Sequence, residues 1–169
     1  MSHSRVRKLA AALALVLISG AALAGTATTT FPVSATAVAA CTVSATTLNF
    51  GTFATLTSPV DATNTLTVNC ALGVPYSVAL SVGTGAGASP ASRKLTATQG
   101  STLNYSIFQS LNDALLQSPW ADGIGGTTLL IGNGTGVDQI FNPFGRIFSG
   151  QTIPFISQYT DTITVTVEF

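Results

Sequence analysis

The most constraining feature of the sequence is a strict alternation of apolar and polar side chains over residues 162–169. Ile163, Val165, Val167 and Phe169 share one face of an extended chain, and threonines with a glutamate share the other. A period of two residues is typical of a β-strand with one buried face. Because the given sequence has no residue after Phe169, we expect this strand to leave one edge unpaired, and an open apolar edge attracts other strands.

Similar short runs recur along the chain, and glycine, proline, serine and asparagine separate them. They predict an all-β fold, either a sandwich or a barrel of short strands. We expect strands at 42–50, 63–70, 75–82, 93–97, 103–108, 127–131, 151–155 and 162–169. Helix is expected only as a turn or two over 111–116, and the glycine-rich stretch 83–91 is expected to be a flexible loop.

The first 24 residues have the three parts of a secretory signal peptide. Arg5, Arg7 and Lys8 precede an apolar run over 9–17, and Ala22-Leu23-Ala24 is a small-residue cleavage site. A membrane-spanning helix is disfavoured because this apolar run is too short. We therefore expect residues 1–24 to be a signal peptide and the remainder to be exported.

Removal of residues 1–24 would leave three basic side chains against six acidic ones, a net charge of −3. A chain with this balance has no basic surface for nucleic acid, so we expect no nucleic-acid partner. The only histidine, His3, would also be lost. Without histidine or a free thiol, the usual Ser-His-Asp and Cys-His arrangements are excluded, and we expect no enzyme activity.

Cys41 and Cys70 are the two cysteines of the chain. An even pair in an exported protein predicts a disulfide. Closing a loop of about 30 residues contributes about 3.5 kcal/mol in the chain-entropy model. A reactive thiol is disfavoured, because the sequence has neither a CxxC spacing nor a nearby activating base.

Residues 26–40, between the signal peptide and Cys41, also alternate and carry no charge. Phe31, Val33, Ala35 and Ala37 fall on one face of an extended chain. A strand at a chain terminus with an apolar row needs a groove to cover that row, because terminal segments are otherwise disordered. The groove belongs either to the strand's own domain or to a neighbouring molecule, and the pattern leaves both open.

Few side chains are candidates for chemistry. Asp113 and Asp122 flank Trp120, and paired carboxylates can cleave glycosidic bonds. We favour a turn at Asp122-Gly123 and a packing role for Trp120, since Asp-Gly is a common turn pair. Calcium binding by Asp122 and Asp138 is disfavoured, because the spacing is not that of a calcium loop. We therefore expect no catalytic residue, no metal site and no cofactor.

Several short motifs together, in order and spacing, resemble the spore coat protein U domain family, the major subunits of archaic chaperone–usher pili of the Csu type. The resemblance covers essentially the whole chain after residue 24. The motifs are Phe31-x-Val33-x-Ala35, CTVSATTLNFG over 41–51, Leu66-Thr-Val-Asn-Cys70 with Gly73 and Tyr76, Leu103-Asn-Tyr105, Trp120-Ala-Asp122-Gly123, Phe144-Gly145-Arg146, Gly150-Gln151 and Tyr159-Thr-Asp161-Thr-Ile-Thr-Val-Thr-Val. Pro32 is a departure, because it removes one backbone donor from an inserted strand.

The resemblance implies an incomplete immunoglobulin-like β-sandwich that lacks its last strand. A periplasmic chaperone lends a strand, and an outer-membrane usher exchanges it for the N-terminal strand of the next identical or related subunit. Residues 25–40 would be the donor extension, with the row that starts at Phe31, and 41–169 the sandwich domain. The C-terminal row over 163–169 would be the acceptor and chaperone-binding edge. The fibre would reach the cell surface and support adhesion and biofilm formation.

Other functions fit the sequence as well. The chain is alternatively a monomeric secreted module that binds carbohydrate or surfaces, or a spore coat component. A tip adhesin is disfavoured, because about 145 residues leave no room for an added receptor-binding domain. Arg146 either pairs with an acid to fix a loop or contacts a neighbouring subunit, and the sequence does not choose between these.

Overall fold

The structure is a computed structural model that describes residues 25–169, so the predicted signal peptide lies outside the described residues. Residues 25–40 contain no helix or strand in the single chain. The side chains of Phe31 and Val33 are 79% and 84% exposed. The expectation that this segment becomes a strand inside a groove therefore stays a prediction.

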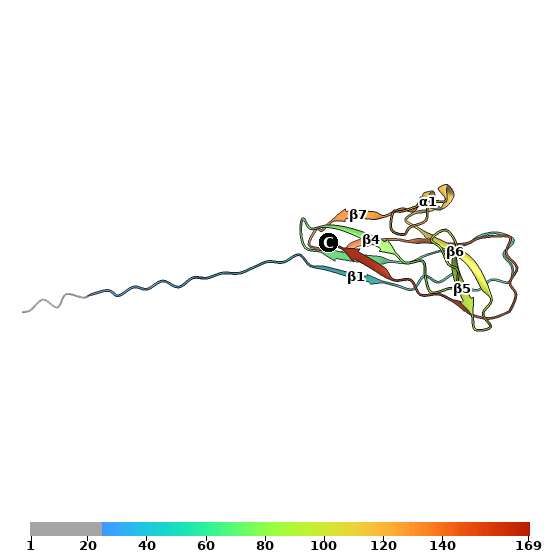
Figure 1. Cartoon of the computed structure of the whole chain (residues 1–169), viewed down its shortest axis with the longest axis horizontal. Helices are drawn as coiled ribbons and strands as arrows, with labels where there is room; N and C mark the ends of the chain where they lie inside the picture. The colour runs from blue at the N-terminus through green and yellow to red at the C-terminus, as the bar shows by residue number, and fades with distance from the viewer. Residues whose placement is uncertain (1–24) are drawn as a thin grey trace, which may run out of the picture. The chain divides into compact units, whose positions relative to one another are not determined.

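The domain that follows is almost entirely β (Figure 1), which confirms the predicted fold class. Its strands are β1 (Cys41–Ala45), β2 (Val60–Thr63), β3 (Leu66–Cys70), β4 (Pro75–Leu80), β5 (Arg93–Ala97), β6 (Thr102–Phe108), β7 (Leu130–Asn133), β8 (Gln139–Phe141), β9 (Phe144–Ile147), β10 (Tyr159–Thr160) and β11 (Val165–Glu168). One short helix, α1 (Leu111–Leu116), lies where a turn or two was expected.

The strands form three antiparallel sheets. Their orders are β1-β3-β8, β10-β5-β6-β9-β2 and β11-β4-β7. The buried core comes from alternate residues of β3 and β4, which is the pattern that the sequence predicted, and from β6, in which Ser106 and Phe108 are buried in addition to the predicted row. The largest buried side chains include Leu66, Leu103, Phe108, Trp120 and Ile147. Within residues 25–169, no helix is long and apolar enough to cross a membrane.

Several predicted strands differ from the structure in their bounds; β3, for example, begins at Leu66 and β4 ends at Leu80. The strand expected over 42–50 ends at Ala45, because Thr46 and Asn64 close the ladder with side-chain hydrogen bonds. Leu48 still packs against the core, over Gly145. A Cβ at Gly145 would lie 2.6 Å from the end of the Leu48 side chain and 2.9 Å from the Phe50 ring, so a larger residue there would displace both side chains.

No strand forms over 151–155, so that prediction was wrong. The Gln151 side chain bonds the backbone of Asn104 as a neighbouring strand would: its Oε1 accepts from the Asn104 N–H at 2.6 Å, and its Nε2 donates to the Asn104 carbonyl at 2.8 Å. Pro154 has no N–H to offer to a ladder. The side chain thus takes the place of a backbone pairing.

The sequence analysis missed β2, β8, β9 and β10, and placed β7 three residues too early. The most consequential omission is β9, which lies between β6 and β2 inside the largest sheet. Its sequence, Phe144-Gly-Arg-Ile, hides its alternation because Gly145 has no side chain and Arg146 faces outward. β10 has two residues, too few for any periodic signal.

Candidate functional site

The C-terminal strand β11 is an edge strand. Within residues 25–169 it pairs with β4 alone, with Val165 opposite Leu80 and Val167 opposite Val78. The carbonyl of Thr164 accepts from the N–H of Ser81 at 3.0 Å. Because backbone groups of successive residues point to opposite sides of a strand, those of Val165 and Val167 point away from β4, toward the open edge.

The predicted acceptor row is only partly covered. Ile163, Val165 and Val167 are half-buried and pack against the core, whereas Phe169 is 58% exposed. The expectation that all four would be buried was therefore wrong for Phe169, which lies beyond the last residue of β11. Regular pairing also begins at Val165 and not at Thr162.

The strand β1 lies close to β11 (Figure 1), and its inward-facing side chains are also only partly covered. Directly opposite residues of an antiparallel pair share one face of the sheet. Val43 is opposite Val68 and Ala45 opposite Leu66, so Val43 and Ala45 face inward. Val43 is nevertheless 40% exposed, while Val68 is fully buried. The inner face is thus uncovered at this margin.

A groove of about 1060 Å³ adjoins the same margin. Its lining comes from Ala45 at the end of β1, the stretch 46–54, Ile153, the stretch 155–163 and the first residue of β11, over a floor of core residues. The apolar lining side chains include Leu48, Phe50, Leu66, Leu80, Ile153, Phe155, Ile163 and Val165. An exposed groove of this composition indicates a binding site for an apolar segment.

A polar cluster fixes the chain just before β11. The carboxylate of Asp161 accepts hydrogen bonds from the Thr84 N–H at 2.7 Å, the Thr84 hydroxyl at 2.9 Å, the Tyr105 hydroxyl at 2.8 Å and the Thr162 N–H at 2.7 Å. Burial, together with the bond to Asp161, raises the pKa of Tyr105 above its ordinary value. A Cβ at Gly83 would lie 2.1 Å from the carboxylate, so glycine is required there.

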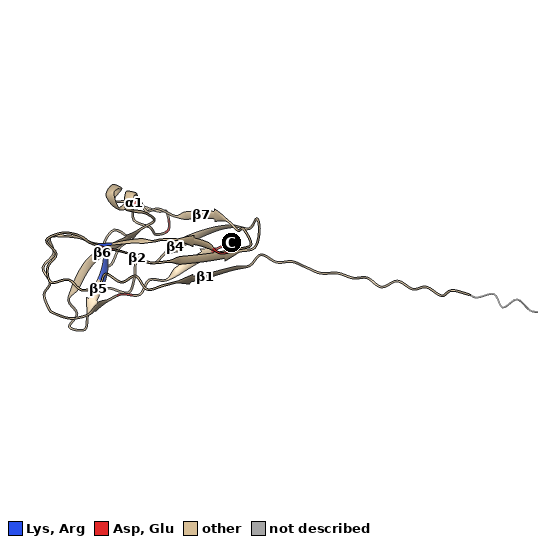
Figure 2. Ribbon diagram, turned by 180° about the vertical axis from the view of Figure 1, so that it is seen from behind, with Lys and Arg blue, Asp and Glu red and all other residues tan. Residues whose placement is uncertain are grey.

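Arg93 is a fully buried cation on β5, the strand that carries a blue stretch in Figure 2. Its guanidinium donates to the carbonyls of Ser81 at 3.0 Å, Pro90 at 2.9 Å and Trp120 at 2.7 Å. Burial lowers the pKa of Arg93, and the charge of Asp161 opposes that effect. Arg93 and Asp161 therefore hold the end of β4 and the start of β11 in place. The sequence analysis assigned no role to either residue.

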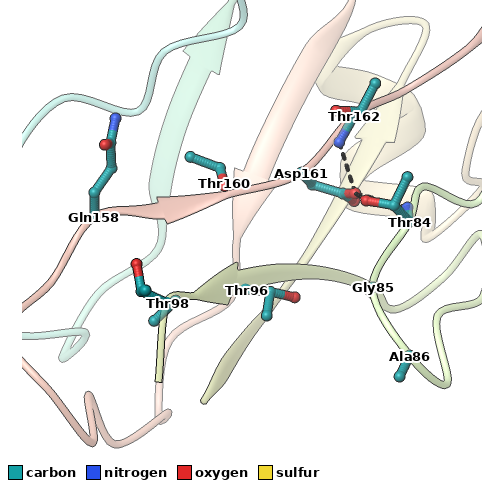
Figure 3. A pocket seen from close by; sticks show the side chains of 10 residues that line it. Thr84, Gly85, Ala86, Thr96, Thr98, Gln158, Thr160, Asp161 and Thr162 are labelled. Carbon is teal, nitrogen blue, oxygen red and sulfur yellow. Dashed lines mark hydrogen bonds between the residues drawn. The ribbon is translucent and has the colours of Figure 1, made fainter. Parts of the chain in front are cut away.

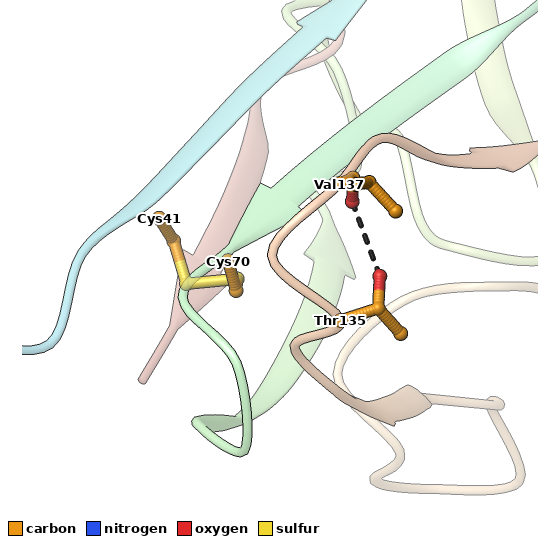
Figure 4. The surroundings of a disulfide bond; sticks show 4 residues. All are labelled: Cys41, Cys70, Thr135 and Val137. Atoms are coloured by element: carbon orange, nitrogen blue, oxygen red, sulfur yellow. Dashed lines mark hydrogen bonds between the residues drawn. A yellow bond between two sulfur atoms is a disulfide. The ribbon is translucent and has the colours of Figure 1, made fainter.

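The predicted disulfide is confirmed (Figure 4). Cys41 and Cys70 are opposite residues of the β1–β3 ladder and are bonded to each other. The bond joins the first residue of β1 to the last residue of β3, beside the turn that holds Thr135 and Val137. It therefore fixes the point at which residues 25–40 enter the domain.

The remaining candidates have local structural roles. Trp120 is buried, and its indole N–H donates to the carbonyl of Val78 at 2.8 Å. The carboxylate of Asp122 caps its own turn by accepting from the Ile124 N–H and the Thr127 hydroxyl, and these bonds lower its pKa. Asp113 bonds Ser110 at the start of α1.

Arg146 pairs with an acid, as one of its two alternatives predicted. Its guanidinium makes two hydrogen bonds to Asp61, at 2.7 and 2.8 Å. The pair joins β9 to β2 at opposite positions of their ladder, so it links two strands and does not fix a loop. Among residues 25–169, no three side chains of His, Cys, Asp or Glu gather as metal ligands do.

An exposed edge strand beside an apolar groove is the arrangement to which an added strand can pair. The chain belongs to the Spore Coat Protein U domain family, because the model of that family matches residues 27–166. Comparison with curated proteins gives no match.

A solved structure is also similar. It is a chain in the crystal structure of the CsuC–CsuE chaperone–tip adhesion subunit pre-assembly complex, from archaic chaperone–usher Csu pili of Acinetobacter baumannii. The match has a TM-score of 0.55 and 25% sequence identity, over 78% of this chain. It covers 40% of that chain, so the present protein spans less than half of that relative. The likeness is consistent with an immunoglobulin-like fold.

Proposed function

We propose that this chain is a structural subunit of a chaperone–usher pilus and polymerises by donor-strand complementation. One observation carries the proposal: the inner faces of β1 and β11 are partly exposed beside an apolar groove, although their cross-strand partners are buried. In a complete sandwich the inward-facing side chains of these strands would be covered as fully as those of their cross-strand partners. The family match supports the proposal, and so does the likeness to a chain of the chaperone–tip adhesion subunit complex.

Residues 25–40 are the proposed donor extension, with Phe31, Val33, Ala35 and Ala37 as its groove-facing row. The free backbone groups of Val165 and Val167 would pair with the incoming strand, and the apolar row would cover the groove. Burying one phenylalanine and one valine contributes roughly 1.5–3 kcal/mol each. Pro32 lies on the other face and lacks an N–H, so the strand would lose one backbone bond on one side only.

Each subunit in this proposal gives a strand to one neighbour and receives a strand from another. Such a contact is heterologous and does not close, so it produces a filament. Before assembly, a periplasmic chaperone would cover the same acceptor edge, Ile163 to Phe169, and an outer-membrane usher would exchange the strands. The chain would divide into a signal peptide (1–24), a donor extension (25–40) and a pilin domain (41–169). Its role would be structural and not enzymatic, in a surface fibre that supports adhesion and biofilm formation.

The test separates the donor strand from the domain. Deletion of residues 26–38 leaves both cysteines and all eleven strands intact, so we expect chaperone co-purification to be retained and fibres to be lost. Val33→Asp should act in the same way, because it would bury a carboxylate without a partner. Ser34→Asp is the matched control, since its side chain falls on the opposite face and fibres should persist.

The readouts are co-purification with the chaperone and SDS-resistant ladders. Fibres formed by the deletion variant would overturn the proposal. Loss of folding on deletion would instead assign residues 26–38 to their own domain, and would favour the monomeric binding module.

A further inference from the structure

Two loop segments line the apolar groove, and they differ in how their large side chains are packed. In the stretch 46–54, Leu48 and Phe50 are half-buried against the core, and the Phe50 ring lies edge-on to that of Tyr105 with 6.0 Å between the ring centroids. In the stretch 155–158, by contrast, Phe155 is half-exposed and Ile156 is fully exposed. The domain therefore uses the first set of side chains in its own packing, whereas Ile156 contributes nothing to it.

The segment that carries Ile156 is fixed at both ends by the domain. Before it, the Gln151 side chain makes two hydrogen bonds to the backbone of Asn104. After it, β10 pairs with β5, and Figure 3 shows the chain from Gln158 onward running beside that strand, where Thr160 is opposite Thr96. The intervening residues thus span the rim of the groove between two anchored points.

Between these anchors the backbone is held by very few hydrogen bonds. In the part of the chain that the structure describes, residues 152–157 make no backbone–backbone hydrogen bond. The hydroxyl of Tyr159 accepts from the Phe155 N–H at 3.4 Å and donates to the Phe155 carbonyl at 3.0 Å. Few backbone bonds and exposed side chains are typical of a segment with low local stability. We call residues 154–157 the flap.

The charges around the groove indicate what the flap would cover. Asp161 is the only charged side chain of the lining, and its carboxylate already accepts four hydrogen bonds. A charged group of an occupant would therefore be buried without a partner, which is unfavourable. Residues 25–40 carry no charge, and the outer row of this segment is small: Thr30, Pro32, Ser34 and Thr36. A large side chain at the rim can lie across such a row.

We propose that the flap packs against the donor strand of another copy once that strand occupies the groove, and that Ile156 contacts the strand directly. The inference rests on the proposed function, because it takes residues 25–40 of a second copy as the occupant. Closure would bury much of the Ile156 side chain, and burial of an isoleucine is favourable. Contacts at an interface act mainly on dissociation, so the flap should slow the release of the strand.

The test uses the full exported chain assembled into SDS-resistant ladders, with Ile156→Ser as the variant. Ile131→Ser is the matched control, since Ile131 is 78% exposed on β7 and lies outside the groove lining. Ile156→Leu tests whether another apolar side chain preserves the effect. The rate at which the ladders dissociate in SDS is measured at one fixed temperature, and the urea midpoint of each variant is measured before assembly.

We expect Ile156→Ser ladders to dissociate about ten times faster than wild-type ladders, as partial exposure of one buried isoleucine implies. Ile131→Ser and Ile156→Leu should dissociate at the wild-type rate. The urea midpoint of Ile156→Ser should be unchanged, because this side chain is exposed in the single chain. In a second readout, maleimide should label the thiol of Ile156→Cys more slowly in ladders than before assembly, whereas Ile131→Cys should be labelled equally in both.

Equal dissociation rates for Ile156→Ser and wild type, or a thiol at position 156 that stays equally accessible in ladders, would overturn this inference and leave the pilin proposal standing. A lowered urea midpoint for Ile156→Ser would assign the side chain to its own domain and would also overturn it. Wild-type protein that forms no ladders would reject the proposed function, and the flap with it.

Discussion

Arg93→Lys tests whether the buried guanidinium of Arg93 holds the end of β4 in place beside β11. The three carbonyl acceptors of Arg93 lie in three separate segments, and all three distances are 3.0 Å or less. An ammonium keeps the charge but is a compact donor on a flexible stem, so it cannot reproduce the planar fork. We expect it to keep one of the three bonds.

Each lost bond from a charged donor is worth about 1.5–3 kcal/mol. Two lost bonds should therefore lower the free energy of unfolding by about 3–6 kcal/mol. This is a large part of the roughly 5–15 kcal/mol that a domain of this size has in total. With a urea m-value of about 2 kcal/mol per molar, the midpoint should fall by about 1.5–3 M.

The assay is urea unfolding followed by the fluorescence of Trp120, the only tryptophan of the chain, with wild type and variants in the same assembly state. The matched control is Arg146→Lys, the same exchange in a partly exposed pair with Asp61. That pair should contribute about 0–1 kcal/mol. A midpoint for Arg93→Lys within the error of the wild type, or a loss equal to that of Arg146→Lys, would refute the reasoning.

Two further predictions concern the same domain. The pKa of Tyr105 is raised in the folded state. Its contribution to stability is therefore complete below about pH 10, the ordinary pKa of tyrosine, and is lost as the pH rises toward the folded-state pKa. Tyr105→Phe should make the urea midpoint fall less steeply above about pH 10, and a fall as steep as that of the wild type would contradict this prediction. The unreduced protein should have no free thiol by mass spectrometry, and two free thiols in exported protein would contradict this. Replacing Cys41 and Cys70 with serine should lower the free energy of unfolding by about 3.5 kcal/mol, for a separation of 29 residues.

The parts of the fold that the sequence predicted are those in which alternation is continuous. β3 and β4 have regular alternation, and their buried positions follow it, whereas β6 alternates only up to Tyr105 and is buried throughout from there to Phe108. β9 was missed because Gly145 leaves a gap in the pattern, although the gap has a purpose, since Leu48 packs there. The strand expected at Gln151 failed because a side chain made the bonds that a backbone would have made.

The candidate site divides in the same way. Its two apolar rows are visible in the sequence because each lies within one short segment. The cluster around Asp161 is not visible, because its partners Thr84 and Tyr105 are 77 and 56 residues away and meet it only in the folded chain. The exposure of Val43 could not be predicted either, because it depends on β1 having no neighbouring strand on its outer side in the folded chain.

The central claim, that residues 25–40 of one copy fill the groove of another, is tested most directly by cysteine cross-linking. Val33→Cys is combined with Val165→Cys or with Val167→Cys, and the same pairings with Ser34→Cys are the control. Disulfides require Cα atoms within about 7 Å, so they report adjacent strands. The account predicts that at least one Val33 pairing gives a covalent ladder of subunits on gels without reductant, and that the Ser34 pairings do not. A bond confined to single chains, or equal ladders from Val33 and Ser34, would contradict it.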